Sequence, residues 1–432
     1  MIMLNNFFKL SQHNTTIRRE IVAGFTTFLT MAYIIAVNPN ILAEAGMDKG
    51  ALITVTALTA CVGTLLMGLW INVPLAMAPG MGLNAFFAYT LVLGEGLSWQ
   101  TALGVVFISG IAFLVLAAFG FREKIVNSIP RSLRLAIPGG IGLFITFIGL
   151  QNMGLVVQSD STLVTLGTFG PPVLLGLTGL LVTLILEARK WRGSILTGIV
   201  VTTGLGILVQ EIEMPAAIIS MPPSIAPTAF ELDIAGALRW GLFGAIFSFM
   251  FVDLFDSVGT IVACSYEADL VEEDGSIKNI SKMLGADAIA TSIGALLGTS
   301  TTTTYVESAS GIEEGGRTGL TAVTVALLFL AALFFAPVIA VIPGYATAPA
   351  LIIVGLFMFR NLREIQFENL EDLVPAFMTI SLMPLTYSIS MGLTFGFISF
   401  ILIKLVTGRA KEIAPVMWII GIFSVLNIFL TM

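Results

Sequence analysis

Three acidic residues lie inside apolar stretches of the sequence, where a charge is costly. Asp253 and Asp256 occur in FSFMFVDLFDSVGT, and Glu307 occurs in TTTTYVESASG. On insertion scales, a carboxylate at the centre of a membrane helix costs at least about 2.5 kcal/mol, so each group needs a compensating role. A spacing of three residues places Asp253 and Asp256 on one face of a helix. Carboxylates in this setting bind polar ligand atoms or take up a proton, and they indicate a substrate-binding and proton-coupling site.

Further side chains near these acids suit a planar ligand that forms hydrogen bonds. Asn84 and Phe86 occur in GMGLNAFFAYT, and Thr304 and Tyr305 precede Glu307. An amide and a hydroxyl can hydrogen-bond such a ligand, and aromatic rings can stack on it. No basic side chain accompanies them in a predicted span, so the set suits a neutral molecule better than an anion.

Each of these residues also has a purely structural explanation. Asp253 and Asp256 could form a network with hydroxyl or backbone groups, and Glu307 could only complement the dipole of a helix N-terminus. Asn84 could be a helix cap, and the aromatic side chains could serve packing alone. The sequence leaves these alternatives open.

The composition identifies a membrane protein. The chain has 432 residues, of which 56% are hydrophobic and 11% charged, and its mean hydropathy is +0.98. A soluble domain carries about 25% charged residues, because its surface must be solvated. The net charge of −7, from 20 basic and 27 acidic residues, argues against a nucleic-acid partner, which requires a concentrated basic surface.

Several kinds of chemistry are not supported. His13, the only histidine, lies in the polar N-terminal arm, and Cys61 and Cys264 lie in apolar segments, so no metal site, catalytic triad or redox pair is indicated. The glycine-rich stretches lack the phosphate-binding pattern of ATPases. We therefore expect no cofactor, no metal and no enzymatic activity, and we favour a secondary transporter.

The spans that position these residues follow from apolar length, since a crossing helix needs about 20 residues. Two of the segments, near Leu83 and Tyr305, are too short to span. The expected segments are 20–37, 51–71, 82–94, 101–119, 136–151, 172–188, 195–209, 237–263, 284–298, 305–313, 318–336, 344–359, 373–387, 389–407 and 414–431. The last of them could cross the membrane or lie along the core.

Basic residues predict the orientation, because Lys and Arg accumulate in cytoplasmic loops. The loops 152–171 and 210–236 contain neither, which suits the opposite face. A cytoplasmic N-terminus puts the basic clusters on one side: Arg18 and Arg19; Arg122, Lys124, Arg131 and Arg134; Arg189, Lys190 and Arg192; Arg360 and Arg363.

The two halves of the sequence resemble each other. Ile129-Pro130 precedes Gly142-Leu143-Phe144 at the same offset at which Ile342-Pro343 precedes Gly355-Leu356-Phe357. An odd number of segments per half would insert the second half upside down, as in secondary transporters. The repeat pairs the segments 74–94 and 299–313, which we interpret as strands that lead into half-helices. Their N-termini would meet near the midplane and favour polar ligand atoms.

The chain resembles a known family over nearly its whole length. APGMGLNAFFAYT, FVDLFDSVGT, GTSTTTTYVESASG, GGRTGLTAV and VPAFMTISLMPLTYSI are similar to signatures of the azaguanine-type purine permeases, a branch of the nucleobase:cation symporter-2 family. The resemblance implies an all-α polytopic fold like that of the bacterial uracil permease, with about fourteen segments as an inverted repeat of seven plus seven. It implies an N-terminal arm (1–19), a core domain (20–120 and 237–336) and a gate domain (121–236 and 337–432).

The resemblance also implies roles for the acidic residues. Asn84, Asp253 and Glu307 occupy the motif positions that hold the purine, and Asp256 occupies that of a supporting acid. To these we add Phe86, Thr304 and Tyr305 as substrate-binding residues, and we give Glu307 and Asp256 the proton-coupling or supporting role.

The expected function is import of purine nucleobases by proton symport across the cell (plasma) membrane. Guanine and hypoxanthine should be preferred over adenine, because an ionised carboxylate offers only acceptors to the ligand. The expected partners are a purine nucleobase, protons and the lipid bilayer, with a homodimer formed through the gate domain. An anion transporter or exchanger on the same inverted-repeat fold is the alternative.

Overall fold

The computed structural model describes residues 2–118, 128–272, 277–365 and 368–431. Arg122 and Lys124, which contributed to the predicted orientation, lie outside these residues. Within them, ten helices are long and apolar enough to cross a membrane, and three further apolar helices are shorter. The chain therefore has the helical, multi-pass architecture that its composition predicts.

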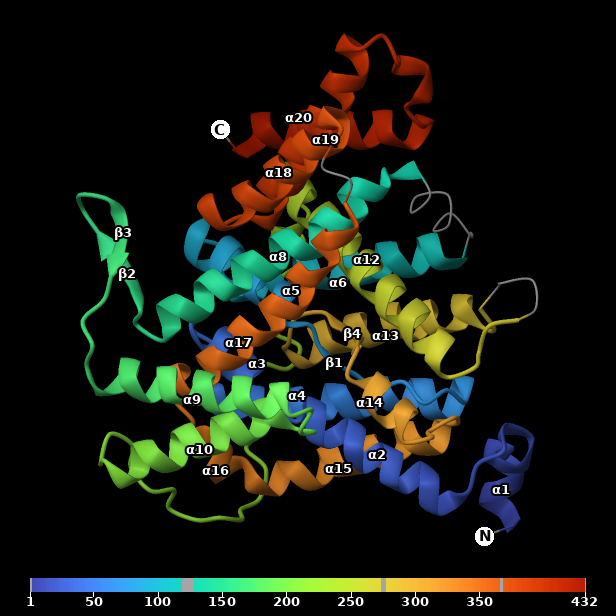
Figure 1. Ribbon diagram of the computed structural model, residues 1–432, viewed down its shortest axis with the longest axis vertical. Coiled ribbons are helices and arrows are strands. Elements are labelled where there is room, and N and C mark those ends of the chain that lie inside the picture. Colours follow the sequence, from blue (N-terminus) through green and yellow to red (C-terminus); the bar gives the residue numbers. More distant parts are fainter. Residues whose placement is uncertain (1, 119–127, 273–276, 366–367, 432) are drawn as a thin grey trace.

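Helices make up almost all of this architecture, with the termini at opposite ends of the molecule in Figure 1. Their bounds are α1 (Ile2–Phe8), α2 (Ile17–Met31), α3 (Ile34–Ala43), α4 (Lys49–Leu65), α5 (Met81–Ala85), α6 (Trp99–Ala118), α8 (Arg131–Asn152), α9 (Pro171–Ala188), α10 (Ser194–Leu208), α11 (Ile234–Ala237), α12 (Phe243–Glu267), α13 (Ile280–Leu297), α14 (Ser308–Glu313), α15 (Gly319–Ala332), α16 (Ala336–Ala340), α17 (Gly344–Phe359), α18 (Leu370–Leu385), α19 (Ile389–Val406) and α20 (Pro415–Thr431).

Two short strands lie near the centre of the molecule, side by side (Figure 1). β1 (Met77–Pro79) pairs antiparallel with β4 (Thr302–Thr304), with Ala78 opposite Thr303. Both are buried, and side chains of neighbouring helices also bind their backbone: the Met77 amide donates to Thr64, the Thr302 amide to Thr291 and the Thr304 amide to Asp287. Each strand leads into a short helix, α5 and α14, as expected for the two interrupted segments.

Small residues let the helices next to this centre approach closely. A Cβ atom at Gly82 in α5 would lie 2.5 Å from the Ile141 side chain in α8. A Cβ atom at Gly142 in α8 would lie 2.5 Å from the carbonyl oxygen of Gly355 in α17. Glycine at these positions permits backbone contact between helices, which is a common way of packing helices in a membrane.

The region 152–171 differs from the connecting loop that the sequence suggests. β2 (Val156–Ser159) and β3 (Leu163–Leu166) form a hairpin there, which projects from the edge of the molecule in Figure 1. The hairpin pairs its own backbone groups, so an exposed connection needs no other partner.

The C-terminal apolar segment is helix α20, which packs on α19. Met417 and Ile420 are buried in that contact. An ion-pair cluster precedes it: Lys404 Nζ lies 2.6 Å from Glu371 and 2.8 Å from Glu412. The cluster ties the start of α18 to the end of α19 and to the turn that leads into α20.

Candidate functional site

A cavity of about 100 Å³ lies where the paired strands and their short helices face α8 and α17. One wall comes from the region around β1, β4, α5, α12 and α14, and it carries the polar groups. The opposite wall is apolar and is formed by Ile141, Val354 and Met358. Its described lining contains two carboxylates, Asp256 and Glu307, and no Lys, Arg or His. The cavity is therefore polar on one side and acidic in character.

Glu307 immediately precedes α14, at the N-cap position of that helix. Its carboxylate accepts a hydrogen bond of 2.5 Å from the Tyr33 hydroxyl. Tyr33 is fully buried in the break between α2 and α3, so this partner holds the carboxylate in place and shields it from solvent on that side. Glu307 keeps access to the cavity, where it can hydrogen-bond a ligand or exchange a proton.

Asp256 on α12 also lines the cavity, half-buried. It makes no hydrogen bond and no ion pair within the part of the chain that the structure describes. A carboxylate that is buried at membrane depth without a partner is costly, and a bound ligand with hydrogen-bond donors would supply the missing partner. Its acceptor oxygens are thus available to the contents of the cavity.

Asp253 lies one turn earlier on α12 but does not line the cavity. It is 1% exposed, and its Oδ2 accepts a hydrogen bond of 3.2 Å from Thr291 on α13, while Oδ1 has no partner. Residues three apart on a helix differ by about 60° in direction, which separates the two acids here. The shared face expected from their spacing is therefore divided: Asp256 faces the cavity, and Asp253 faces α13.

Asn84 and Phe86 also lie outside the cavity lining. Asn84 is fully buried on α5, and neither of its side-chain polar atoms has a partner, so it does not cap the helix; that position belongs to Gly80. The Phe86 ring packs on the ring of Phe249, with centroids 4.8 Å apart, and is fully buried. This ring packs the helical segment Phe86–Gly94, which continues α5, against α12 in the observed conformation.

Thr304 and Tyr305 both line the cavity. The Tyr305 hydroxyl donates a hydrogen bond of 2.5 Å to the Pro79 carbonyl, so the ring is fixed across the two strands. The Thr304 hydroxyl donates to Asp287 at 3.3 Å, and the Thr304 amide donates to the same carboxylate oxygen at 3.1 Å. Thr304, in the cavity wall, is thus joined by two hydrogen bonds to Asp287, which does not line the cavity.

Asp287 on α13 and Tyr33 are two residues that the sequence reasoning missed. Asp287 is fully buried and, besides the two bonds from Thr304, accepts one of 2.7 Å from the hydroxyl of Ser257. The signal for Asp287 was present, because it is a carboxylate within the predicted span 284–298. Tyr33 had no comparable signal, since its partner is distant in the sequence.

The cavity continues into a vestibule of about 580 Å³ between α8, α12 and α17. The two spaces share Asp256 and Glu307 on their walls. At its other end the vestibule reaches Arg131 and Arg134, at the start of α8. A ligand at the two carboxylates thus has a path toward the basic end of α8.

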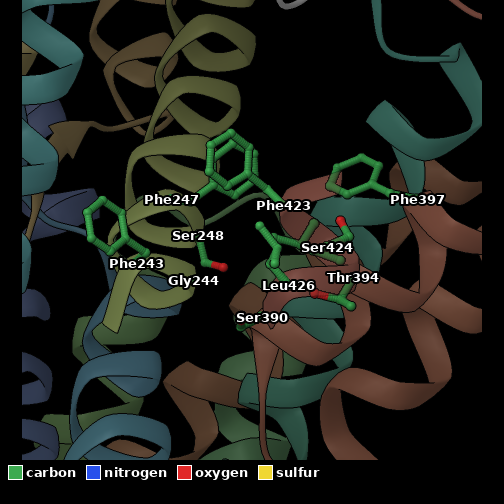
Figure 2. Close-up of a pocket in the computed structure, with 11 residues that line it drawn as sticks. Phe243, Gly244, Phe247, Ser248, Ser390, Thr394, Phe397, Phe423, Ser424 and Leu426 are labelled. Carbon is green, nitrogen blue, oxygen red and sulfur yellow. The ribbon is translucent and has the colours of Figure 1, made fainter. Parts of the chain in front are cut away.

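A separate cavity of about 310 Å³ lies between α12, α19 and α20 (Figure 2). Figure 2 shows the Phe247 and Phe423 rings at its edge, and their centroids are 6.2 Å apart in a stacked arrangement. Its described lining holds aromatic, aliphatic and hydroxyl side chains and no ionisable group. It offers no carboxylate to a ligand or proton, so we assign the functional site to the acidic cavity.

Comparison with known proteins gives a consistent result. A family model described as a permease family matches residues 18–395. The adenine permease of Escherichia coli strain K12 is 45% identical over 427 residues, which cover 99% of this chain and 96% of that protein. The guanine/hypoxanthine permease of Bacillus subtilis strain 168 is 44% identical over 438 residues, covering 99% of each.

Among solved structures, the transmembrane domain of a cyanobacterial bicarbonate transporter is similar, with a TM-score of 0.68. The match covers 86% of this chain and 96% of that domain, at 17% sequence identity. At this identity the likeness concerns the fold alone.

Proposed function

The chain belongs to the permease family, and on this premise we propose that it imports purine nucleobases by proton symport across the cytoplasmic membrane. Members of such a family are transporters and not enzymes. Relatives at 44–45% identity are named as adenine and as guanine/hypoxanthine permeases. The observation that carries the proposal is the unpartnered carboxylate of Asp256, which lines the same cavity as Glu307, and the described lining of that cavity contains no basic residue.

In the proposed complex, Asp256 and Glu307 accept hydrogen bonds from the base. The binding role that the family resemblance implied for Asp253 passes to Asp256, because only Asp256 lines the cavity. Asp253 supports α12 through Thr291. Tyr305 offers its ring to the planar face of the base, and Thr304 contributes a polar wall.

Asn84 and Phe86 keep an indirect role in this proposal. Both lie on the segment that follows β1 and are fully buried next to the cavity wall. Asn84 retains the full hydrogen-bonding capacity of its amide, because neither polar atom is engaged. It would contact the substrate only after a movement of α5.

Glu307 is the proposed proton carrier. It is the cavity acid that has a fixed protein partner, the Tyr33 hydroxyl, and that also remains open to the cavity. A proton on Glu307 removes the charge that must otherwise be moved through the membrane interior with the substrate. Loading with base and proton together would thus favour transfer.

We further propose fourteen segments in two inverted halves that divide into core (20–120 and 237–336) and gate (121–236 and 337–432). The antiparallel pairing of β1 with β4 supports it, because each strand would come from one half. The backbone contact of Gly142 with Gly355, which the repeat pairs, also supports it. The polar wall of the cavity then belongs to the core and the apolar wall to the gate, so that sliding of one on the other would alternate access.

The proposed orientation places the N-terminus and the vestibule mouth in the cytoplasm. Arg192, between α9 and α10, forms an ion pair with Glu314, which follows α14. Arg131 pairs with Glu364 in the turn after α17. Of these basic residues, Arg131 lines the vestibule together with Arg134, and we place this end of the vestibule on the cytoplasmic side because Lys and Arg accumulate there.

Preference for guanine and hypoxanthine follows from the carboxylates. Guanine presents N1–H and its 2-amino group side by side, hypoxanthine presents N1–H, and adenine presents an acceptor at N1 beside its 6-amino donor. An ionised carboxylate can accept from the donors of guanine and hypoxanthine, whereas its oxygens would face the N1 acceptor of adenine. The relatives do not decide this point, since both specificities occur at similar identity.

Uptake of radiolabelled guanine, hypoxanthine, adenine, uracil and sulfate into cells that express the protein tests the function. Concentrative uptake of a purine that collapses with a protonophore would support the proposal. Uptake of sulfate without purine uptake would instead favour the anion transporter.

A further inference from the structure

Arg134 is a cationic side chain in the vestibule wall that the proposed transport cycle does not use. Its Nε atom is inaccessible to solvent and has no hydrogen-bond partner. Within the described residues, Arg134 forms neither an ion pair nor any side-chain hydrogen bond. The neighbouring Arg131 differs, because it pairs with Glu364 at 3.1 Å. The vestibule therefore has one neutralised and one free guanidinium at its mouth.

The position of Arg134 in the fold makes it a strong anion-binding group. It lies in the first turn of α8, which contains no acidic residue, and Pro130 at the N-cap position supplies no side-chain cap. A cation is unfavourable at a helix N-terminus, where the dipole end and the free amides already favour an anion. An anion bound here would give the Arg134 guanidinium the partner that it lacks.

The other end of the vestibule has the opposite character. Arg134 and Pro138 line the vestibule, and Ile141 lines the inner cavity, so one face of α8 runs from the guanidinium to the acids. Seven residues of helix cover about 10 Å. The vestibule, of about 580 Å³, is also lined by Asp256 and Glu307 and by the aromatic side chains Phe255 and Phe357. The complementary ligand has hydrogen-bond donors on a planar ring at one end and an anion at the other.

We propose that the vestibule binds a purine nucleoside monophosphate from the cytoplasm, with its phosphate on Arg134 at the N-terminus of α8 and its base toward Asp256 and Glu307. The base end rests on the proposed purine function, whereas the phosphate end rests on Arg134 alone. A nucleotide in this position occupies the path between the inner cavity and the cytoplasm. It therefore inhibits release of the imported base, and the cell's nucleotide level limits uptake.

Binding is tested first on the purified full-length protein in detergent, by isothermal titration with guanosine 5′-monophosphate, guanosine and inorganic phosphate. We expect the monophosphate to bind at least about tenfold more tightly than either fragment, because both ends of the vestibule are engaged. Arg134→Gln should weaken it by about tenfold or more, and Arg134→Lys should restore part of the loss. Arg131→Gln is the matched control, and it should change the affinity little because that arginine is already paired.

Inhibition is then measured in proteoliposomes that contain the monophosphate in the compartment facing the vestibule. The readout is uptake of labelled guanine, which is expressed relative to the uninhibited rate of the same variant. Loss of inhibition in Arg134→Gln and its retention in Arg131→Gln would support the proposal. Equal inhibition in all variants would overturn it, and so would phosphate binding as tightly as the monophosphate, which would show a simple anion site.

The two proposals fail separately in these experiments. Normal guanine uptake with no monophosphate binding overturns the vestibule proposal and leaves the transport proposal intact. Absence of purine uptake from the unmodified protein counts against the transport function. In that case monophosphate binding that depends on Arg134 would still support the vestibule proposal, and its absence would overturn that as well.

Discussion

Replacing Asp256 by Asn changes the hydrogen-bonding character of the cavity with almost no change in size. The carboxylate makes no hydrogen bond within the described residues, so the substitution breaks no internal contact. In the proposed complex, the two oxygens accept from N1–H and the 2-amino group of guanine. The amide keeps one acceptor and places its NH₂ group against the other donor. We therefore expect guanine binding to weaken selectively, without loss of folded protein.

The size of the expected loss in guanine binding follows from the hydrogen bond that Asp256→Asn removes. Loss of one hydrogen bond to a charged group costs about 1.5 to 3 kcal/mol, which corresponds to a rise of about tenfold to 150-fold in the KM for guanine. For adenine, an amide donor now meets the N1 acceptor while the amide oxygen accepts from the 6-amino group. Adenine should therefore improve relative to guanine by a similar or larger factor.

Competition for labelled hypoxanthine uptake by unlabelled guanine and adenine measures this ratio. Asp253→Asn is the matched control, because it makes the same chemical change at a residue outside the cavity lining, and it should leave the guanine-to-adenine ratio near that of the unmodified protein. Two results would refute the reasoning: adenine competing as well as guanine in the unmodified protein, or a larger shift in the ratio for Asp253→Asn than for Asp256→Asn. The second would restore the roles that the family resemblance implies.

Three further outcomes are expected. Glu307→Gln should abolish accumulation of purine against its gradient, measured with an imposed pH gradient, because the amide cannot take up the coupled proton; full proton-driven uptake would contradict its role. Gly142→Ala should destabilise the protein by about 1 to 3 kcal/mol in thermal unfolding, since the new Cβ would lie 2.5 Å from the Gly355 carbonyl oxygen; an unchanged unfolding temperature would show that α8 and α17 can separate. Hydrogen bonds from Arg409, and next from Lys404, lower the pKa of Glu412, so its contribution to the folded state is complete above the ordinary pKa of Glu and is lost as pH falls through the lowered value. Hydrogen exchange in α20 should therefore rise on acidification in the unmodified protein and much less in Glu412→Gln, and equal rises in both would remove Glu412 as the cause.

The sequence was sufficient for the architecture around the site because that architecture depends on strong local signals. Apolar runs of span length predict membrane helices, and ten such helices are present within the described residues. Pro79 and Gly80 in one segment, and the threonine run before Glu307 in the other, interrupt helix formation, and strands stand at both places. The hairpin in 152–171 had no such signal, since its strands are short and mostly exposed.

The division of roles among the acids could not be predicted from spacing. Asp253 and Asp256 share a face within the tolerance of helix periodicity, and the difference of about 60° between them matters only once the neighbours are known. Asp253 on α12 meets Thr291 on α13, whereas Asp256 on the same helix lines the cavity. The position of a ligand cavity depends on helix rotation, which tertiary packing sets and local sequence does not.

The acids behind the cavity explain why the sequence holds more carboxylates than a purine can contact. Asp287 accepts bonds from the backbone and side chain of Thr304 and from the hydroxyl of Ser257, and that hydroxyl lies 2.7 Å from the hydroxyl of Thr303. Asp287 thus fixes β4 to α12 and α13 directly behind the cavity wall. A ladder of only three residue pairs would not by itself hold a strand rigidly at membrane depth, because each of its backbone bonds is weak. In this arrangement the buried acid stiffens the wall, and Asp256 and Glu307 remain available for the proposed binding of the substrate and transfer of the proton.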